Sequence, residues 1–579
     1  MNNEINLSTE TAEQNKNKAI AEIAEQKENN ETNQASKVSL PVKPVKPLPA
    51  MDRADIIMAF AMLFAAYIGT DAFGIFTGSE KLGIGASVFV FVYTAALYLY
   101  AKLKNITVSR EGIFWTVILL ILGSSYTFVY NASIEYYINV FVRLLMLYIA
   151  LSIYGVLISK NTSVYIFYDG LNALFVIPFS NIKRIFSAWK AVFKSDGGKS
   201  RYRYIAQAVL GVIIGSPFIF LIIATLVNAD DRFADIMNSI HLLDISSVTD
   251  FIGKIIFSLP AAMYFFGLAY GAANKVKADA FKLEVLEKDG ENLHIIPRVS
   301  IYSIFILVII IYVIFIGIQA GYFFDALRGI LPKEFTYSEY ARRGFFELIT
   351  VCIINICLIC LGDVFIKRKA EEKDLVQSAI IITMSIFTLF LIITALTKMF
   401  LYINAYGMTP LRVVPSIFML YLSCVFILII IGRLKGIKIF AKCIYMAGIF
   451  IALLSISNMD GIIAGYNLKA YQSKKIRDYG KDILYDGGYA SIPEIYRAWQ
   501  SSDSREFKEE MEAIATDIVF FGSGGDFLYS GEAYESREPR MHYDAGNKSY
   551  ACRVFSESPL KYKNLSKYNA EKYVNEMLK

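Results

Sequence analysis

Long apolar stretches, separated by short polar connections, fill the chain from residue 55 to residue 458. Eleven of them reach the length of roughly 20 residues that an α-helix needs to cross the hydrocarbon core of a bilayer. We therefore predict membrane spans at 55–76, 83–102, 112–130, 137–158, 203–227, 251–273, 297–323, 343–366, 377–403, 412–432 and 438–458.

The two ends of the chain are polar. Residues 1–50 are rich in Glu, Lys, Asn and Gln and contain no aromatic residue, so we expect them to be disordered. They lack the apolar core of a signal peptide, so we expect the first span to act as an uncleaved anchor. Residues 465–579 mix amphipathic helical patches with turns, and about 115 residues suffice for an independent core. We expect a small soluble domain, helical or α+β, after a bundle over residues 51–460.

One segment between the spans has another pattern. In residues 182–194, basic and bulky apolar residues alternate at helical spacing. Such a helix lies on the membrane surface, and Trp189 belongs at the depth of the lipid headgroups.

Composition agrees with this pattern. Hydrophobic residues make up 55% of the chain and charged residues 19%, and the mean hydropathy is +0.44. These values exclude a soluble globular enzyme and a disordered chain. Five of the six cysteines lie in apolar stretches and Cys552 stands alone in the polar tail, so there is no disulfide framework. The predicted class is an all-α polytopic membrane helix bundle with a small C-terminal domain.

The basic residues indicate the orientation. With a cytoplasmic N-terminus, 28 Lys and Arg residues fall in or near inside loops and at most nine fall outside. The positive-inside rule therefore predicts a cytoplasmic N-terminus. Because the number of spans is odd, we expect the C-terminal domain outside the cytoplasm. The expected location of the protein is a plasma membrane. The net charge of +6 reflects this topology, and no nucleic-acid partner is expected.

One outer loop carries charges that the positive-inside rule disfavours. Thr336 and Glu339 form a capping box for a new helix. On that helix Glu339, Arg343 and Glu347 lie four residues apart, so the arginine can bridge two carboxylates. The simpler interpretation is a charge ladder where a helix enters the membrane. The alternative is an external site for an anion or headgroup that includes Arg342.

A second outer loop is predicted to be a tight hairpin. Gly407 permits the turn, Thr409 can cap the next helix, and Pro410 suits that helix's first position. Arg412 and Lys398 make this helix end electropositive. An anion site is one interpretation, and a well-built hairpin with outward-reaching cations is the simpler one.

Three charged residues lie inside predicted spans: Asp71, Arg143 and Asp363. Arg143 is the most interior by position and could coordinate a substrate, while Asp71 could relay a proton. Pairing of such residues inside the bundle is the more common arrangement.

Catalytic signatures are weak. The three histidines lie in separate segments without metal-ligand spacing, and we expect no metal and no cofactor. Residues 196–200 end like a phosphate-binding loop, but Phe193 replaces that motif's first glycine. The glycine-rich residues 522–526 are typical of a plain turn. The sequence thus favours a protein that is not an enzyme and leaves the question open.

Several stretches together resemble a known family of bacterial multi-pass membrane proteins, catalogued only as a domain of unknown function (family four-one-seven-three). They are Leu226–Phe233, Gln319–Phe324, Thr336–Leu348, Leu401–Arg412 and Ile463–Lys469. The likeness covers roughly residues 200 to 500, with lysine at position 398 where the family suggests arginine. The resemblance implies the membrane architecture and brings no activity, substrate or catalytic residue.

Two functions from different classes fit these features. The first is an envelope sensor or scaffold, in which the external domain binds an envelope protein or a cell-wall component while the bundle sits in the lipid bilayer. The alternative is a transporter of a small molecule or ion that uses Arg143 and Asp71. A transporter usually contains an internal repeat of helices, and no convincing repeat is visible in the sequence. A membrane-embedded transferase is a weaker third possibility.

Overall fold

The protein is described here from a computed structural model. The described residues are 49–72, 83–129, 131–193, single positions between 204 and 233, 245–327, 337–366, 374–521, 543–544, 549–550 and 565–578. Several predicted features lie outside these residues. They are the N-terminal tail, most of the span 203–227, the glycine-containing residues 196–200 and 522–526, and Cys552.

Within the described residues, eight helices are long and apolar enough to cross a membrane. They are α2 (Arg53–Ala72), α3 (Ile84–Leu103), α4 (Arg110–Phe128), α5 (Glu135–Ile153), α13 (Arg298–Leu327), α14 (Tyr337–Phe365), α15 (Leu375–Tyr406) and α16 (Pro410–Lys435). The pair α17 (Phe440–Ile456) and α18 (Met459–Gln472), bent by 57°, makes up to nine. A further helix, α11 (Ile245–Ala273), has a shorter apolar stretch over Phe257–Ala273. A helical membrane bundle is thus confirmed, and the total of eleven spans stays a prediction.

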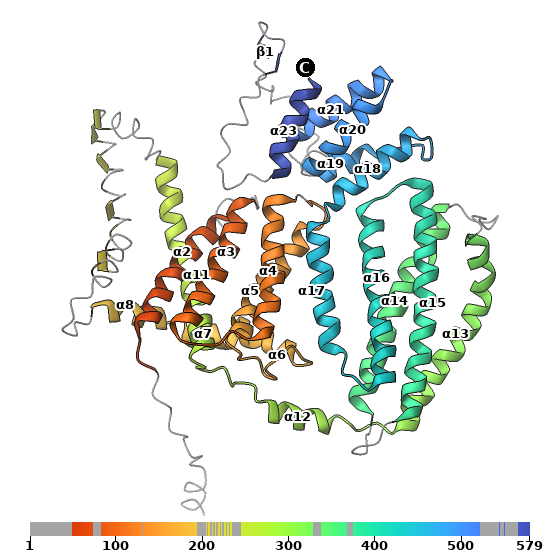
Figure 1. Cartoon of the computed structure of the whole chain (residues 1–579), viewed down its shortest axis with the longest axis horizontal. Helices are drawn as coiled ribbons and strands as arrows, with labels where there is room; N and C mark the ends of the chain where they lie inside the picture. Colours follow the sequence, from red (N-terminus) through yellow and green to blue (C-terminus); the bar gives the residue numbers. More distant parts are fainter. Residues whose placement is uncertain are drawn as a thin grey trace, which may run out of the picture. The chain divides into compact units, whose positions relative to one another are not determined.

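The remaining elements are short. They are α6 (Ile166–Leu171), the π-helical η1 (Asn172–Val176), α7 (Ile177–Asn181), α8 (Arg184–Phe193), α12 (Leu283–Asn292), α19 (Lys481–Gly487), η2 (Gly488–Ala490), α20 (Ile492–Ser501), α21 (Arg505–Phe521), β1 (Tyr543–Asp544), β2 (Ser549–Tyr550) and α23 (Leu565–Met577). Helix α8 coincides with the predicted surface helix. Figure 1 shows α6, α7, α8 and α12 near one end of the long helices and α19 to α23 near the other.

Buried side chains divide the helices into three groups. The first bundle (α2–α8 and α11) encloses the largest core, and the second bundle (α13–α16) has a core of its own. A third core belongs to the tail domain, which we define as α19, η2, α20, α21 and α23. Helix α17 joins the two bundles, because Tyr445 packs against Phe114 of α4 at 5.0 Å while Phe450 packs against Tyr421 of α16 at 5.6 Å.

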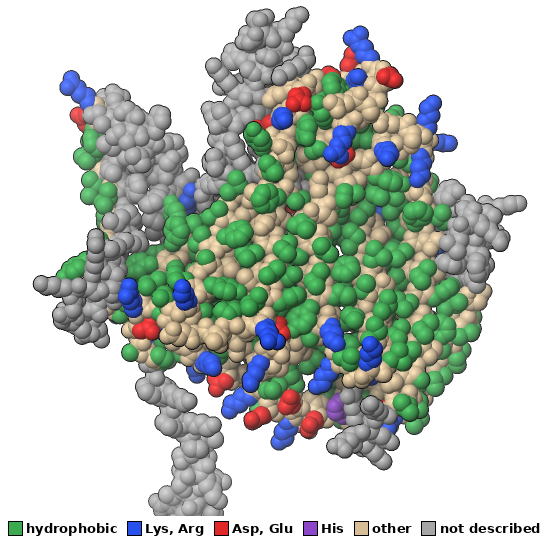
Figure 2. Space-filling model, viewed as in Figure 1, with side chains coloured by type: hydrophobic (Ala, Val, Ile, Leu, Met, Phe, Trp, Pro, Cys, Tyr) green, Lys and Arg blue, Asp and Glu red, His purple; other side chains and the backbone are tan. Residues whose placement is uncertain are grey.

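The outer surface of the bundles is suited to lipid. Figure 2 shows hydrophobic side chains covering the sides of the long helices, with charged side chains gathered toward both ends. Phe64, Leu307 and Phe400 are examples, each about 60% exposed on a membrane helix. An apolar belt between two charged rims is the surface of a protein that spans a bilayer.

Candidate functional site

The charged residues that the sequence singles out do not share one site among the described side chains. Arg143 is exposed on α5 of the first bundle, whereas Lys398 is buried on α15 of the second. Glu347 is exposed on α14, a neighbour of α15, and its carboxylate attracts the Lys398 ammonium electrostatically. Asp71 closes α2 and residues 339–343 begin α14, but these side chains lie outside what is described.

Asp363 pairs within the second bundle. Arg433 of α16 forms an ion pair with one of its carboxylate oxygens, and Gln377 of α15 donates a hydrogen bond of 3.0 Å to the other. The side chain thus joins three neighbouring helices near one end of this bundle, which agrees with the more common arrangement of an intramembrane charge.

The hairpin predicted around Gly407 is present between α15 and α16. Gly407 ends α15 with φ +80° and ψ 176°, a conformation that essentially only glycine adopts. Thr409 occupies the N-cap position of α16 and Pro410 its first position, as predicted. The Thr409 side chain, however, makes no capping hydrogen bond.

Arg412 stabilises this hairpin from within. Its guanidinium donates hydrogen bonds to the carbonyl oxygens of Tyr406 at 3.1 Å and Gly407 at 2.5 Å. It also lies 4.0 Å from the centre of the Tyr402 ring. A cation is favourable at the carbonyl end of a helix, so these contacts support the hairpin interpretation of Arg412.

The same hairpin is bonded to α18, a contact that the sequence did not predict. Asn467 of α18 accepts a hydrogen bond from the backbone N–H of Met408 at 2.7 Å and donates one to the Met408 carbonyl at 2.9 Å. A Cβ atom added at Gly407 would lie 2.6 Å from the Asn467 oxygen. Glycine is therefore required here both for its φ angle and for the close approach of α18.

A second contact ties α18 to the connection between α4 and α5. The Asp460 carboxylate accepts hydrogen bonds from the Ser133 hydroxyl at 2.6 Å and from its backbone N–H at 3.1 Å. Asn131 accepts from the Met459 N–H at 2.8 Å and donates to the Ser455 carbonyl at 3.1 Å. Both chain segments at the bend between α17 and α18 are thereby fixed to the first bundle.

Helix α18 also contributes to two hydrophobic cores. Met459 and Ile463, in its first turns, belong to the core of the first bundle, whereas Ala464 and Leu468 belong to the core of the tail domain. We call α18, with its Asn467–Met408 and Asp460–Ser133 contacts, the junction. It connects the tail domain to both bundles.

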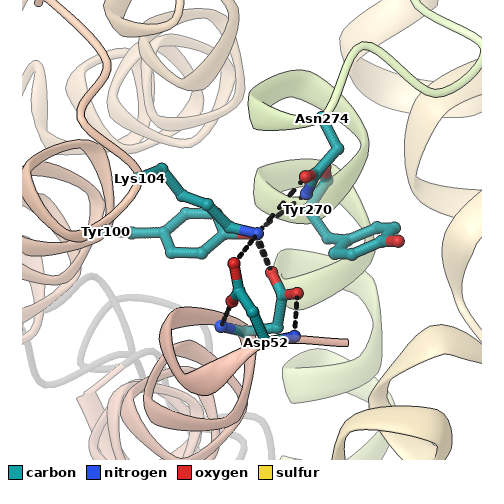
Figure 3. A network of polar contacts seen from close by, with 6 residues as sticks. Asp52, Tyr100, Lys104, Tyr270 and Asn274 are labelled. Atoms are coloured by element: carbon teal, nitrogen blue, oxygen red, sulfur yellow. Dashed lines mark hydrogen bonds and ion pairs between the residues drawn. The ribbon is translucent and has the colours of Figure 1, made fainter. Parts of the chain in front are cut away.

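A separate polar network lies where α2 begins and α3 and α11 end (Figure 3). The Lys104 ammonium lies 2.8 Å from a carboxylate oxygen of Asp52 and 2.8 Å from one of the fully buried Asp55. Tyr100 donates a hydrogen bond of 2.6 Å to Asp55, and Asn274, the residue after α11, accepts one from Lys104 at 3.3 Å. We call these five residues the inner clamp.

The electrostatics of the inner clamp follow from this geometry. Partial burial opposes the charge of Asp52, but the hydrogen bond and charge of Lys104, with the Asp55 N–H, hold the pKa of Asp52 below its usual value. Burial likewise opposes the charge of Lys104, and its two carboxylate partners outweigh burial, so the pKa of Lys104 is raised. The clamp keeps its ion pairs at neutral pH and holds the three helix ends together.

The sequence did carry a local signal for the inner clamp. Asp52 and Asp55 accept hydrogen bonds from each other's backbone N–H at 2.9 and 3.0 Å, a reciprocal cap at the start of α2. In the sequence Lys104 counts only as one of many basic residues on the inner side. In the described part of the chain, no three His, Cys, Asp or Glu side chains come together as metal ligands.

The helices, the apolar belt and the charged ends define a multi-pass helical membrane protein. The chain belongs to a family described as "Domain of unknown function (DUF4153)", whose model matches residues 116–498. The expectation of an uncharacterised domain family is confirmed, and the number of the matching family is DUF4153 in place of four-one-seven-three. Neither the curated proteins nor the solved structures gave a match. The matched range contains every residue of the junction contacts and begins after α3.

Proposed function

We propose that the protein is an envelope sensor or scaffold whose tail domain, outside the cytoplasm, binds an envelope protein or a cell-wall component. The junction is the observation that carries this proposal. A domain that was merely tethered to the last span would need only a flexible connection, without packing or hydrogen bonds to the bundles. Here α18 shares its apolar face between two cores and hydrogen-bonds to both bundles.

The energies of these contacts are small enough for the junction to transmit a binding event at the tail domain to the two bundles. Each hydrogen bond between Asn467 and Met408 contributes about 0.5–1.5 kcal/mol, and a bond to a charged group such as Asp460 contributes about 1.5–3 kcal/mol. Couplings between distant sites typically amount to about 1–3 kcal/mol. Breaking one contact of the junction thus requires a free energy that binding of a partner to the tail domain can supply.

The transporter alternative has no comparable support among the described residues. It needs charged side chains that converge on a polar site near the middle of the membrane. Arg143 and Lys398 instead belong to different bundles, one exposed and the other buried.

The first test concerns the side of the membrane. Ser504 lies exposed before α21 and Asn292 lies exposed at the end of α12. Each is replaced by cysteine in a Cys552→Ser background, and intact cells are treated with a membrane-impermeant maleimide. We expect labelling of Ser504→Cys only, above the signal of the background protein. Labelling of Asn292→Cys alone would place the tail domain in the cytoplasm and reject the proposal.

The second test concerns the partner. A photoreactive amino acid is introduced at Arg497 of α20 and at Arg505 of α21, whose side chains are 70% and 91% exposed, and at Asn292 as the matched control. We expect discrete cross-linked products in intact cells, or attachment to cell-wall material, from position 497 or position 505 and not from position 292. If Arg497 and Arg505 both give none while the tail domain is labelled from outside, the sensor and scaffold roles are wrong.

A further inference from the structure

The segment that follows α5 is seated directly on a membrane helix. Gly267 and Gly271 of α11, four residues apart, lie against α7. A Cβ at Gly267 would lie 2.7 Å from the Pro178 carbonyl oxygen, and one at Gly271 would lie 2.5 Å from the Asn181 amide nitrogen. Small residues at this spacing allow close packing between helices in a membrane.

This contact extends well inside the end of α11. Tyr264 donates a hydrogen bond of 2.8 Å to the Leu174 carbonyl, and its ring lies 5.8 Å from that of Phe179. Tyr264 precedes the last residue of α11, Ala273, by nine positions. At 1.5 Å per residue this is about 13 Å along the helix. Part of the segment η1–α7 therefore lies beside the apolar stretch Phe257–Ala273 of α11 and not beyond its end.

Large apolar side chains of this segment are exposed. They are Val164, Phe167, Phe175, Phe179 and Phe186, between 40% and 69% exposed. Leaving large apolar side chains in water costs roughly 1.5–3 kcal/mol each, and lipid acyl chains at this depth remove that cost.

Helix α8 adds cations and hydrogen-bond donors at the same level. Lys183 and Lys190 are exposed. One guanidinium nitrogen of Arg184 and the indole nitrogen of Trp189 are buried, and each lacks an acceptor among the described residues. The Arg184 guanidinium lies 5.7 Å from the centre of the buried Tyr270 ring of α11. Two buried donors beside two lysines match the phosphate of a lipid headgroup.

We propose that residues 164–193 form an in-plane element embedded in the leaflet at this end of the bundle, and that α8 binds the phosphate of an anionic phospholipid. The exposed apolar side chains enter the acyl region. Arg184, Lys183 and Lys190 contact the headgroup, and Trp189 donates its indole N–H to it. The proposal is independent of what the tail domain binds.

Trp189 itself reports on this site. The full-length protein is reconstituted in phosphatidylcholine vesicles that contain either brominated phosphatidylcholine or brominated phosphatidylglycerol at equal mole fraction. The contribution of Trp189 to the fluorescence is the difference between wild type and Trp189→Phe. We expect both lipids to quench it, and the anionic lipid at a several-fold lower mole fraction.

Two variants separate the headgroup site from general attraction. Arg184→Gln should reduce the preference for the anionic lipid roughly fivefold, the effect of one cation at a membrane surface. Lys288→Gln removes an exposed cation from α12 and should leave the preference unchanged. Equal quenching by both lipids, unaffected by Arg184→Gln, would overturn the headgroup site.

The embedding has its own test. Quenching of Trp189 by aqueous iodide and by neither brominated lipid would overturn the in-plane element. If Trp189→Phe does not fold, Phe175→Cys provides the measurement: it should resist an impermeant maleimide in inside-out vesicles that label Lys288→Cys. Equal labelling of the two cysteines would overturn the element as well.

Discussion

Gly407 offers a sharp test of the junction. Replacing it with alanine places a Cβ atom 2.6 Å from the Asn467 oxygen, at a φ of +80°. Two effects then act together: backbone strain at position 407, and displacement of Asn467 from its two hydrogen bonds to Met408. The substitution should open the hairpin and free α18 from the second bundle.

The magnitudes follow from these contacts. A non-glycine residue in this backbone region costs about 1–3 kcal/mol. Loss of two hydrogen bonds adds about 1–3 kcal/mol. Gly407→Ala should therefore destabilise the local structure by about 2–6 kcal/mol and Asn467→Ala by about 1–3 kcal/mol. Because the hydrogen bonds are lost only once, the double variant should resemble Gly407→Ala alone.

Amide hydrogen exchange of the detergent-solubilised protein measures these changes locally. Peptides from the α15–α16 hairpin and from α18 should exchange at least tenfold faster in Gly407→Ala and at least about fivefold faster in Asn467→Ala, since 1.4 kcal/mol corresponds to a factor of ten. Gly436→Ala is the matched control, because Gly436 has φ +67° and an added Cβ meets nothing within 4 Å. It should affect the end of α16 alone. Additive effects of Gly407→Ala and Asn467→Ala would refute the reasoning, because the two residues would then act independently.

Four further predictions concern the inner clamp and the packing of α17 on α4. Lys104→Met leaves the buried Asp55 carboxylate without its cation and should cost about 3–5 kcal/mol in thermal stability, and adding Asp55→Asn should recover much of it. The pKa of Asp52 is lowered, so its stabilising effect is present above its usual pKa of 3.8 and is lost as the pH falls below that value. Below about pH 5, the melting temperature of an Asp52→Asn variant should therefore depend less on pH than that of the wild type. The melting temperature should likewise fall above pH 10.5, because Lys104, whose pKa is raised, then loses its proton. Gly448→Val would place a side chain 2.7 Å from the Trp115 ring and should cost about 1–3 kcal/mol, so an unchanged melting temperature would contradict the close packing of α17 on α4.

Local patterns predicted the local structure well. Apolar length located the membrane helices, and the turn chemistry of Gly407, Thr409 and Pro410 gave the hairpin with its helix start. Hydropathy fixes where a helix lies along the chain but not how it is rotated about its axis. For that reason Arg143, the most interior charge by position, could not be assigned to a helix face, and the structure places it on an exposed one.

Long-range contacts were invisible for a different reason. Asp460 lies 327 residues from Ser133, and Asn467 lies 59 residues from Met408. Neither asparagine nor aspartate in a helical segment indicates by itself which backbone it will meet. The inner clamp is intermediate, since the reciprocal cap of Asp52 and Asp55 is a local pattern while its partner Lys104 is 52 residues away from Asp52.

The contacts at the two ends of the first bundle differ in strength, and this difference decides where a relay would act. The inner clamp contains the fully buried Asp55 carboxylate, and removing its cation costs about 3–5 kcal/mol. The junction has one charged contact, between Asp460 and Ser133, and one neutral contact, between Asn467 and Met408. The neutral contact is the weakest of the three, at about 1–3 kcal/mol for its two hydrogen bonds. Under the proposed function, a partner that pulls on the tail domain therefore releases the α15–α16 hairpin first, while the first bundle stays closed at its inner end.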